Sequence, residues 1–311
     1  MLSCTGNSER AVRRRLALKD LAQDLAIARP AMSALSNGYL GGGSERLPVR
    51  GQAQPRCAGG GGRVKAVGVY SIKGGVGKTA TAVNLAYLAA AAGQRTLVWD
   101  LDPQGAASYY FRIKPKVKGG GRGLLRGKRG ADDAIKGTDF EGLDLLPADF
   151  SYRHMDILLE GAKKKPVDQL QRLLKPFVKE YDLVLFDCPP SISLMSENIF
   201  RAADALLVPL IPNTLSARTL AQLQDFLKSE GGFGALKVLP FFSMVDAARP
   251  LHTETMAHLS AEYPEMLPAA IPLAPEVERM GLRRMPLPAY APSDAAAGAY
   301  RALWDEVAAA L

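Results

Sequence analysis

Two lysines stand five residues apart in a glycine-rich stretch, SIKGGVGKTA, at residues 71–80. The glycines of this stretch are Gly74, Gly75 and Gly77. Glycines at this spacing let backbone N–H groups surround an anion, so that Lys78 can reach the β- and γ-phosphates of a nucleotide. The hydroxyl of Thr79 can ligate Mg²⁺. The stretch therefore predicts a loop that binds the phosphates of a nucleotide. Lys78 is sufficient for that task, so Lys73 is an additional lysine that needs another explanation.

The sequence on either side supplies the elements that must hold such a loop. VKAVGVYSI at 64–72 is an apolar strand pattern, and TATAVNLAYLAAAAG at 79–93 is an alanine-rich helix whose positive N-terminal end points at the phosphates. Further strands are expected at 95–102, 143–148, 181–187, 203–211, 236–246 and 266–272, and a last helix at 293–311. This alternation predicts the α/β class, with a mostly parallel, doubly wound sheet covered by helices on both faces.

The loop departs from the standard Walker A pattern, because Ile72 stands where the first glycine is expected and a lysine, Lys73, follows it. The form Lys-Gly-Gly-x-Gly-Lys-Thr resembles the deviant Walker A loop of the ParA/MinD family of P-loop ATPases, and most of all that of Soj-like ParA partition ATPases. The resemblance implies that Lys78 serves the ATP of its own subunit, whereas Lys73 reaches the partner's ATP across a dimer interface. It implies a nucleotide-contact set of Lys73, Gly74, Gly75, Val76, Gly77, Lys78, Thr79 and Ala80.

Two more motifs follow in the order found in that family. DLDPQG at 100–105 resembles its switch segment, which implies that Asp102 contacts the Mg²⁺ shell and positions the attacking water. YDLVLFDCPPS at 181–191 resembles the Walker B strand, which implies that Asp187 holds Mg²⁺ through water. The implied metal set is Thr79, Asp102 and Asp187, and the implied catalytic set is Lys73, Lys78 and Asp102.

Two positions differ from the family pattern, and neither removes a phosphate or metal contact that we consider essential. The hydroxyl residue that often follows Thr79 is Ala80 here, which removes one hydrogen bond to the α-phosphate, worth about 1 kcal/mol. The usual asparagine after Asp-Pro-Gln-Gly is Ala106. We therefore expect an ATPase whose hydrolysis is Mg²⁺-dependent, slow and stimulated by a partner.

The net charge of +8 is concentrated in two zones. Residues 1–63 contain ten Arg and Lys against four Asp and Glu, and residues 112–130 contain eight basic residues and no acidic one. Clustered positive charge favours a polyanion such as DNA, although a pair of solvated, flexible basic segments has the same composition. Besides the basic loop at 112–130, the candidate DNA contacts are Lys237, Arg279, Arg283 and Arg284.

The N-terminal part of the chain has a separate character. Residues 1–40 include LKDLAQDLAIARPAMSALSNG at 18–38, whose apolar spacing fits a helix-turn-helix, while a single broken amphipathic helix or a disordered segment fits it as well. Residues 41–62 read as a linker rich in glycine and proline, and residues 63–311 as the ATPase domain. A helix-turn-helix here allows a second function, a nucleotide-controlled transcription regulator.

Several classes are disfavoured by composition. Cys4, Cys57 and Cys188 form no C-x-x-C pair, which argues for a reduced, cytosolic chain without a zinc site or disulfide framework. No apolar run approaches the roughly 20 residues of a membrane span. The last helix, AYRALWDEVAAAL, lacks the basic amphipathic character of a MinD-like membrane anchor. Amide ligases of the cobyrinate and biotin pathways share the nucleotide fold, but they lack the lysine found here at Lys73.

The function that the motifs and the resemblance imply together is an ATP-dependent, dimerising, DNA-binding ATPase that partitions or positions a plasmid, a chromosome region or another cargo. Its cofactors are expected to be ATP and Mg²⁺. Its partners are expected to be non-specific nucleoid DNA, a second copy of itself and a ParB-like or other cargo-linked activator, with no membrane. The expected location is the cytoplasm, on the nucleoid.

Overall fold

A single sheet of eight strands organises the part of the chain that the computed structural model describes, residues 64–125, 131–162, 165–233 and 235–311. The strand order is β3-β4-β2-β5-β1-β6-β7-β8, and all neighbours are parallel except β3 and β4. The strands are β1 (Lys65–Val69), β2 (Thr96–Asp100), β3 (Lys136–Gly137), β4 (Leu143–Leu146), β5 (Leu183–Asp187), β6 (Ala205–Leu210), β7 (Lys237–Val245) and β8 (Ala270–Pro272). The predicted sheet is confirmed, apart from the unpredicted edge strand β3. The expectations for residues 1–40 and 41–62 concern a part of the chain outside the described residues.

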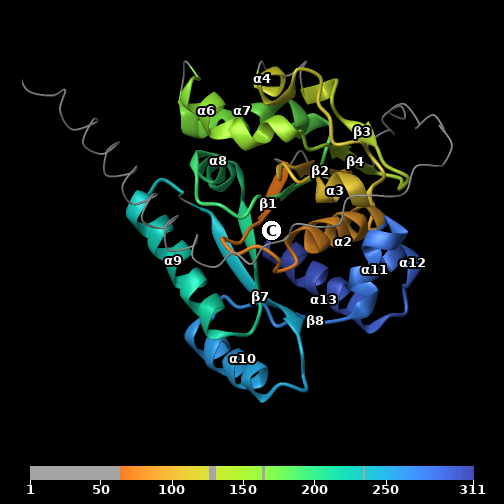
Figure 1. Cartoon of the computed structure of the whole chain (residues 1–311), viewed down its shortest axis with the longest axis vertical. Coiled ribbons are helices and arrows are strands. Elements are labelled where there is room, and N and C mark those ends of the chain that lie inside the picture. The colour runs from red at the N-terminus through yellow and green to blue at the C-terminus, as the bar shows by residue number, and fades with distance from the viewer. Residues whose placement is uncertain (1–63, 126–130, 163–164, 234) are drawn as a thin grey trace, which may run out of the picture. The chain divides into compact units, whose positions relative to one another are not determined.

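Helices cover both faces of this sheet (Figure 1). The α-helices are α2 (Lys78–Ala91), α3 (Ala106–Tyr110), α4 (Gly120–Leu124), α6 (Met155–Glu160), α7 (Gln169–Leu174), α8 (Leu194–Ala202), α9 (Thr214–Glu230), α10 (Pro250–Glu262), α11 (Pro275–Arg283), α12 (Leu287–Tyr290) and α13 (Ala295–Ala310). Three short 3₁₀ helices are η1 (Phe150–His154), η2 (Pro166–Asp168) and η3 (Lys175–Lys179). One apolar cluster packs α6, α7, α8 and α9 against one face of the sheet. A second cluster packs α2, α11, α12 and α13 against the opposite face. The doubly wound arrangement is confirmed.

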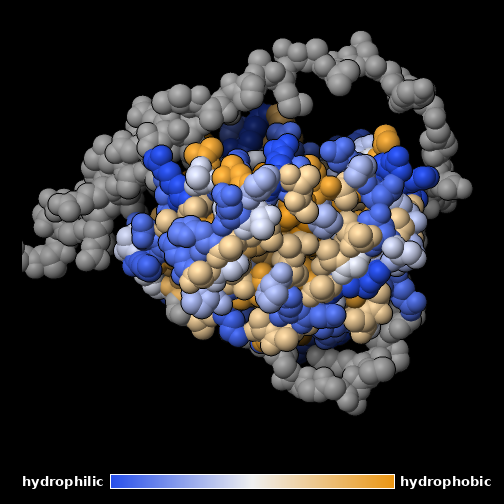
Figure 2. Space-filling view, turned by 90° about the horizontal axis from the view of Figure 1, so that it is seen from below, coloured by the Kyte–Doolittle hydropathy of each residue, from blue (hydrophilic) through white to orange (hydrophobic). Residues whose placement is uncertain are grey.

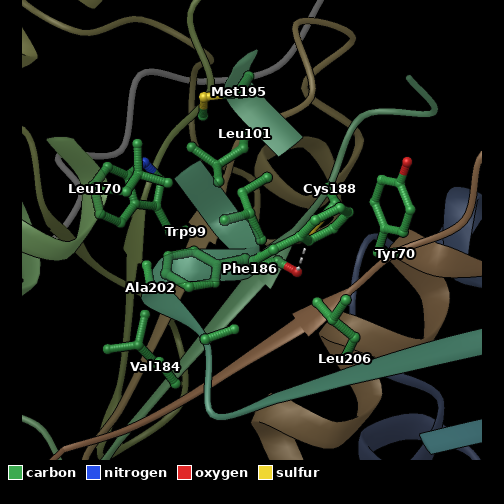
Figure 3. Packing of buried hydrophobic residues seen from close by; sticks show 14 of the residues in the cluster. Tyr70, Trp99, Leu101, Leu170, Val184, Phe186, Cys188, Met195, Ala202 and Leu206 are labelled. Atoms are coloured by element: carbon green, nitrogen blue, oxygen red, sulfur yellow. Dashed lines mark hydrogen bonds between the residues drawn. The ribbon is translucent and has the colours of Figure 1, made fainter. Parts of the chain in front are cut away.

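Strands buried on both faces explain the continuous apolar runs of the sequence. In β5, Val184 and Phe186 enter the first cluster, whereas the intervening Leu185 enters the second. Phe186 lies beside Trp99 of β2, with ring centroids 5.7 Å apart, and Leu170 of α7 lies in the same cluster (Figure 3). The central strands are thereby fixed in register, which fixes the loops that follow their carboxyl ends.

A close approach at Gly68 of β1 gives the first testable prediction. A Cβ at Gly68 would lie 2.9 Å from Leu206 Cδ2 and 3.2 Å from Ile199 Cγ2, inside the first cluster. We expect Gly68→Ala to lower the free energy of unfolding by about 1–3 kcal/mol because of overpacking. Gly298 of α13 has open space around its Cα, so Gly298→Ala should raise stability by up to about 1 kcal/mol. Urea unfolding of both variants without nucleotide measures the difference, and a shift of the same sign in both would contradict it.

The described part of the predicted basic loop, residues 112–125, is folded. Helix α4 lies within it, and Ile113, Val117 and Leu124 are buried in the two apolar clusters. Residues 126–130 lie outside the described residues. A solvated, flexible segment was one of the two interpretations that the composition allowed, but three buried apolar residues hold this part of it against the domain.

Hydrophobic and hydrophilic residues are both exposed on the face of the molecule near α10 (Figure 2). Figure 2 views the molecule from the side that lies lowest in Figure 1, and weakly hydrophobic residues occupy the middle of this face with hydrophilic residues around them. Within the described ranges, no helix combines the length and the hydropathy that crossing a membrane requires.

Candidate nucleotide-binding site

The predicted nucleotide motifs meet at the carboxyl ends of three adjacent strands. β5 lies between β1 and β2, and Asp187 at its end pairs in register with Val69 on one side and Asp100 on the other. The loop at 70–77 follows Val69, and the segment at 101–105 follows Asp100. Parallel α/β sheets bind ligands at this edge, where the loops diverge.

The glycine loop takes a backbone path that requires glycine. Gly75 and Gly77 have φ angles of 73° and 90°, a left-handed region that other residues rarely adopt. A Cβ at Gly77 would also lie 2.9 Å from Ser243 Oγ in β7, so the loop is in close contact with the strand beyond β6. Gly74 and Gly75 are exposed, whereas Val76 is buried and anchors the loop. The helix α2 begins at Lys78, directly after the loop.

The two lysines occupy different environments. Lys78 is buried, and its Nζ donates a hydrogen bond to the carbonyl oxygen of Lys73 at 3.1 Å. Burial lowers the pKa of Lys78, and the carboxyl group of Asp187 acts in the opposite direction. Lys73 is half-buried at the start of the loop, where its backbone N–H donates to Ser71 Oγ at 3.3 Å. Lys78 is thus directed into the loop, while the Lys73 side chain enters no ion pair among the described residues.

Asp187 is a buried acid whose oxygens are left for a ligand. Its side chain is fully buried, and neither carboxylate oxygen has a hydrogen-bond partner among the described residues. Burial raises the pKa of Asp187 well above its usual range, the charge of Asp100 adds to this, and the Thr79 hydroxyl opposes it. A carboxylate with free lone pairs beside a threonine hydroxyl fits the oxygen ligands that Mg²⁺ prefers.

Asp100 is a site residue that sequence reasoning missed. Its Oδ2 accepts hydrogen bonds from the backbone N–H and the hydroxyl of Ser108, at 2.8 and 2.7 Å, while Oδ1 has no partner in the described part of the chain. Burial raises the pKa of Asp100 to about 7. The signal was present in DLDPQG, which has an acid at the strand end as well as Asp102, but only strand pairing places it beside Asp187.

Asp102 sits in a tight turn at the same edge. Its Oδ1 accepts from the N–H of Gln104 at 2.9 Å, and its carbonyl oxygen accepts from the N–H of Gly105 at 2.9 Å. The preceding Leu101 donates its N–H to the carbonyl oxygen of Asp187 at 3.0 Å. The turn leads directly into α3, so a change at Asp102 is transmitted to that helix.

The acidic groups at this edge do not make a metal site on their own. Within the described ranges, no group of three His, Cys, Asp or Glu side chains is arranged to hold a metal ion. Mg²⁺ at this place would therefore depend on Thr79, on nucleotide phosphates and on water, which is the usual arrangement for Mg²⁺ in nucleotide enzymes. Cys188, which follows Asp187, is fully buried, as expected for a small core residue.

The candidate DNA contacts divide between two places, and three of the four side chains make contacts within the domain. Lys237 begins β7, and its Nζ donates to the carbonyl oxygen of Ala310 at 2.5 Å. Arg279 pairs with Glu276 on α11. The guanidinium of Arg284 lies 4.6 Å from the Tyr109 ring centroid. The fourth candidate is Arg283, an exposed residue at the end of α11.

Comparison with known proteins identifies relatives of the nucleotide domain. The AAA domain family model matches residues 64–230. Soj of Bacillus subtilis is 34% identical over 165 residues, which cover 53% of this chain and 65% of Soj. ParA of Myxococcus xanthus is 36% identical over 152 residues, which cover 49% of this chain and 53% of ParA. The matched part thus spans between about half and two thirds of these relatives.

Solved structures extend the likeness over most of the described chain. MinD of Pyrococcus furiosus, a cell division ATPase, superposes with a TM-score of 0.65 at 23% identity, covering 79% of this chain and 99% of MinD. The cobyrinic acid a,c-diamide synthase of Mycobacterium smegmatis, solved with ADP and magnesium, gives a TM-score of 0.65 at 26% identity. The match covers 78% of this chain and 93% of the synthase. On the sequence match and the shared fold, the chain belongs to the ParA/MinD family of ATPases.

Proposed function

We propose that this protein is a partition ATPase that binds ATP and Mg²⁺, closes into a dimer, coats DNA without sequence preference and is released by an activator on its cargo. The observation that carries the proposal is the pair of lysines in one phosphate loop. Lys78 is buried and directed into its own loop, whereas Lys73 stands at the edge of the loop without an ionic partner among the described residues. A cation donated by a second subunit can stabilise the charge that develops on the transferring phosphoryl group.

In this proposal each residue of the loop has a defined task. The backbone of residues 74–77 surrounds the phosphates, and Lys78 exchanges the carbonyl oxygen of Lys73 for phosphate oxygen. Thr79 and Asp187 hold Mg²⁺, which when bound neutralises charge on the β- and γ-phosphates. Asp102 orients the attacking water from the turn after β2. Asp100 keeps this turn in place through Ser108.

Exposed apolar residues support a second copy as the occupant of the same edge. Leu215, Leu251 and Leu273 follow the carboxyl ends of β6, β7 and β8, and they are 60%, 55% and 47% exposed. They lie at the edge that carries the phosphate loop, because parallel strands end on one side of the sheet. Closing two copies over this edge would bury these leucines and bring Lys73 to the partner's phosphates.

The experiment that tests the proposal is binding of the full chain to random-sequence duplex DNA with ATP, with ADP and without nucleotide, alongside the molar mass in solution. We expect a dimer and DNA binding only with ATP and Mg²⁺, and an affinity that falls steeply with salt. DNA binding that is equal in all three states would overturn the nucleotide control. ATP turnover that requires a carboxylic acid substrate and an amide donor, without DNA binding, would place the chain with the diamide synthases instead.

A further inference from the structure

The basic segment that follows α3 is a shaped part of the domain rather than a free loop. The N–H of Val117 donates to Asp149 Oδ2 at 2.9 Å, and the N–H of Gly121 donates to Ser151 Oγ at 2.9 Å. Val117 and Leu124 are buried in the first apolar cluster, against α6 and η1. Hydrogen bonds and core packing therefore fix the path of the backbone over residues 117–124.

The glycines in this segment allow a close turn. Gly119 and Gly120 have φ angles of 79° and 58°. A Cβ at Gly120 would lie 2.4 Å from Ser151 Oγ, and one at Gly123 would lie 2.5 Å from the carbonyl oxygen of Lys118. A larger residue at Gly120 would push the segment off η1, and one at Gly123 would collide with the backbone of the segment itself. The absence of a side chain at Gly120 and Gly123 lets the backbone lie close to Ser151 and to the carbonyl oxygen of Lys118.

Four basic side chains belong to this segment, two of them just before Val117 and two within residues 117–124, and we call them the basic platform. They are Lys114, Lys116, Lys118 and Arg122. All four are exposed, and within the described residues none of them forms an ion pair. Residues 112–125 contain no acid, and the facing Asp149 is occupied by Val117 and Ser151. Burial acts to raise the pKa of Asp149, but hydrogen bonds from Ser151 and Val117 and the charge of Lys116 lower it, so the positive charge of the platform is partly offset at Lys116.

The platform also touches the turn that carries Asp102. A Cβ at Gly105 would lie 2.9 Å from Pro115 Cβ, so the side chain of Pro115, which stands between two platform lysines, packs close to the end of this turn. Between them runs α3, whose Ser108 binds Asp100. A movement of the turn on ATP binding or hydrolysis would be transmitted to the platform through this contact.

We infer that the basic platform is the surface on which the phosphate backbone of duplex DNA binds. The inference rests on the proposed function and adds to it the place of the DNA and the route by which nucleotide controls it. Spaced, unpaired cations on a rigid support suit a phosphate backbone, and they need no base contacts. An anionic membrane surface is disfavoured, because the apolar residues of the platform segment, Ile113, Val117 and Leu124, are buried and unable to insert.

The test is a matched pair of charge-reversal variants in the full chain. The platform variant is Lys114→Glu with Lys116→Glu and Lys118→Glu. The control variant reverses three exposed lysines on η3 and α9 that are also free of ion pairs among the described residues, namely Lys175, Lys179 and Lys228. Both change the net charge equally, so a difference between them reports position rather than total charge. Stabilisation by Mg-ATP, measured by thermal unfolding, confirms that each variant is folded and binds nucleotide.

With ATP, we expect the platform variant to bind duplex DNA about 10–100-fold more weakly than the control variant, and the slope of log K against log salt to fall by about 2.7, the value for three lost phosphate contacts. Equal affinity of the two variants would overturn the inference while leaving the proposed function intact. Failure of the wild type itself to bind DNA would instead overturn the proposed function. Binding of the wild type to phosphatidylserine vesicles, lost in the platform variant, with no DNA binding would assign the platform to a membrane.

Discussion

Lys73→Ala is expected to lower the ATPase rate of the dimer by about 10³-fold or more, the range found for a phosphate-directed residue donated by a partner. ATP-dependent DNA binding is expected to be lost with it, because the dimer would no longer close. ATP binding by the single subunit should change little, since Lys78 is the lysine directed into the loop. Initial rates of phosphate release and equilibrium binding of a fluorescent ATP analogue measure the two effects separately.

A mixing experiment decides whether Lys73 acts on its own nucleotide or on that of the partner. The Lys73→Ala chain keeps its ATP site, and a Lys78→Ala chain keeps the lysine to be donated. In a mixed dimer, one of the two sites then has both lysines, so a one-to-one mixture should recover about a quarter of the wild-type rate for a symmetric dimer. Each variant alone should remain inactive. A mixture no more active than its components would show that Lys73 serves its own subunit.

The elements around the nucleotide were predictable because their signals are local. The strand before the loop, the alanine-rich helix after it and the apolar runs that became β2, β4, β5, β6 and β7 each lie within a short window of sequence. Asp187 was found in the same way, as an acid at the end of a buried strand. The antiparallel edge strand β3 was missed, since two residues, Lys136–Gly137, carry no periodic signal.

Features that depend on distant residues were not predictable in this way. Asp100 becomes part of the site only because β2 pairs with β5, which sets it opposite Asp187. The basic segment is folded because its hydrogen-bond acceptors, Asp149 and Ser151, lie 32 and 30 residues further along the chain. Composition alone predicted a loop there. Long-range pairing decides both cases, and a single sequence does not contain the pairing explicitly.

Asp187 is expected to lower the stability of the nucleotide-free protein while contributing to the binding of Mg-ATP. Asp187→Asn is expected to raise the free energy of unfolding of the nucleotide-free protein by about 1–3 kcal/mol at pH 8, because it removes a carboxyl group whose charged form is disfavoured by burial. The same change should remove most of the stabilisation by Mg-ATP, which for the wild type is about 2.7 kcal/mol at a hundredfold excess over Kd. Urea unfolding with and without Mg-ATP measures both.

The raised pKa of Asp187 also predicts how the free energy of unfolding changes with pH. A carboxyl whose pKa is raised on folding stabilises the protein while it is protonated, and that contribution is lost as the pH rises above the unfolded pKa of about 4. The nucleotide-free wild type should therefore lose stability from pH 5 to pH 8 more than Asp187→Asn does. Asp100, whose pKa is raised to about 7 by burial, adds a loss of its own over the same pH range.

Asp182→Asn is the matched control for Asp187→Asn, since it changes an acid in the same segment, just before β5, that is partly exposed and paired with Arg95. It should lower stability slightly and leave the Mg-ATP shift intact, because an exposed ion pair contributes little. If Asp187→Asn destabilised the nucleotide-free protein as Asp182→Asn does, the buried carboxylate would have a structural partner after all. If it kept the full Mg-ATP shift, Asp187 would not be a magnesium residue.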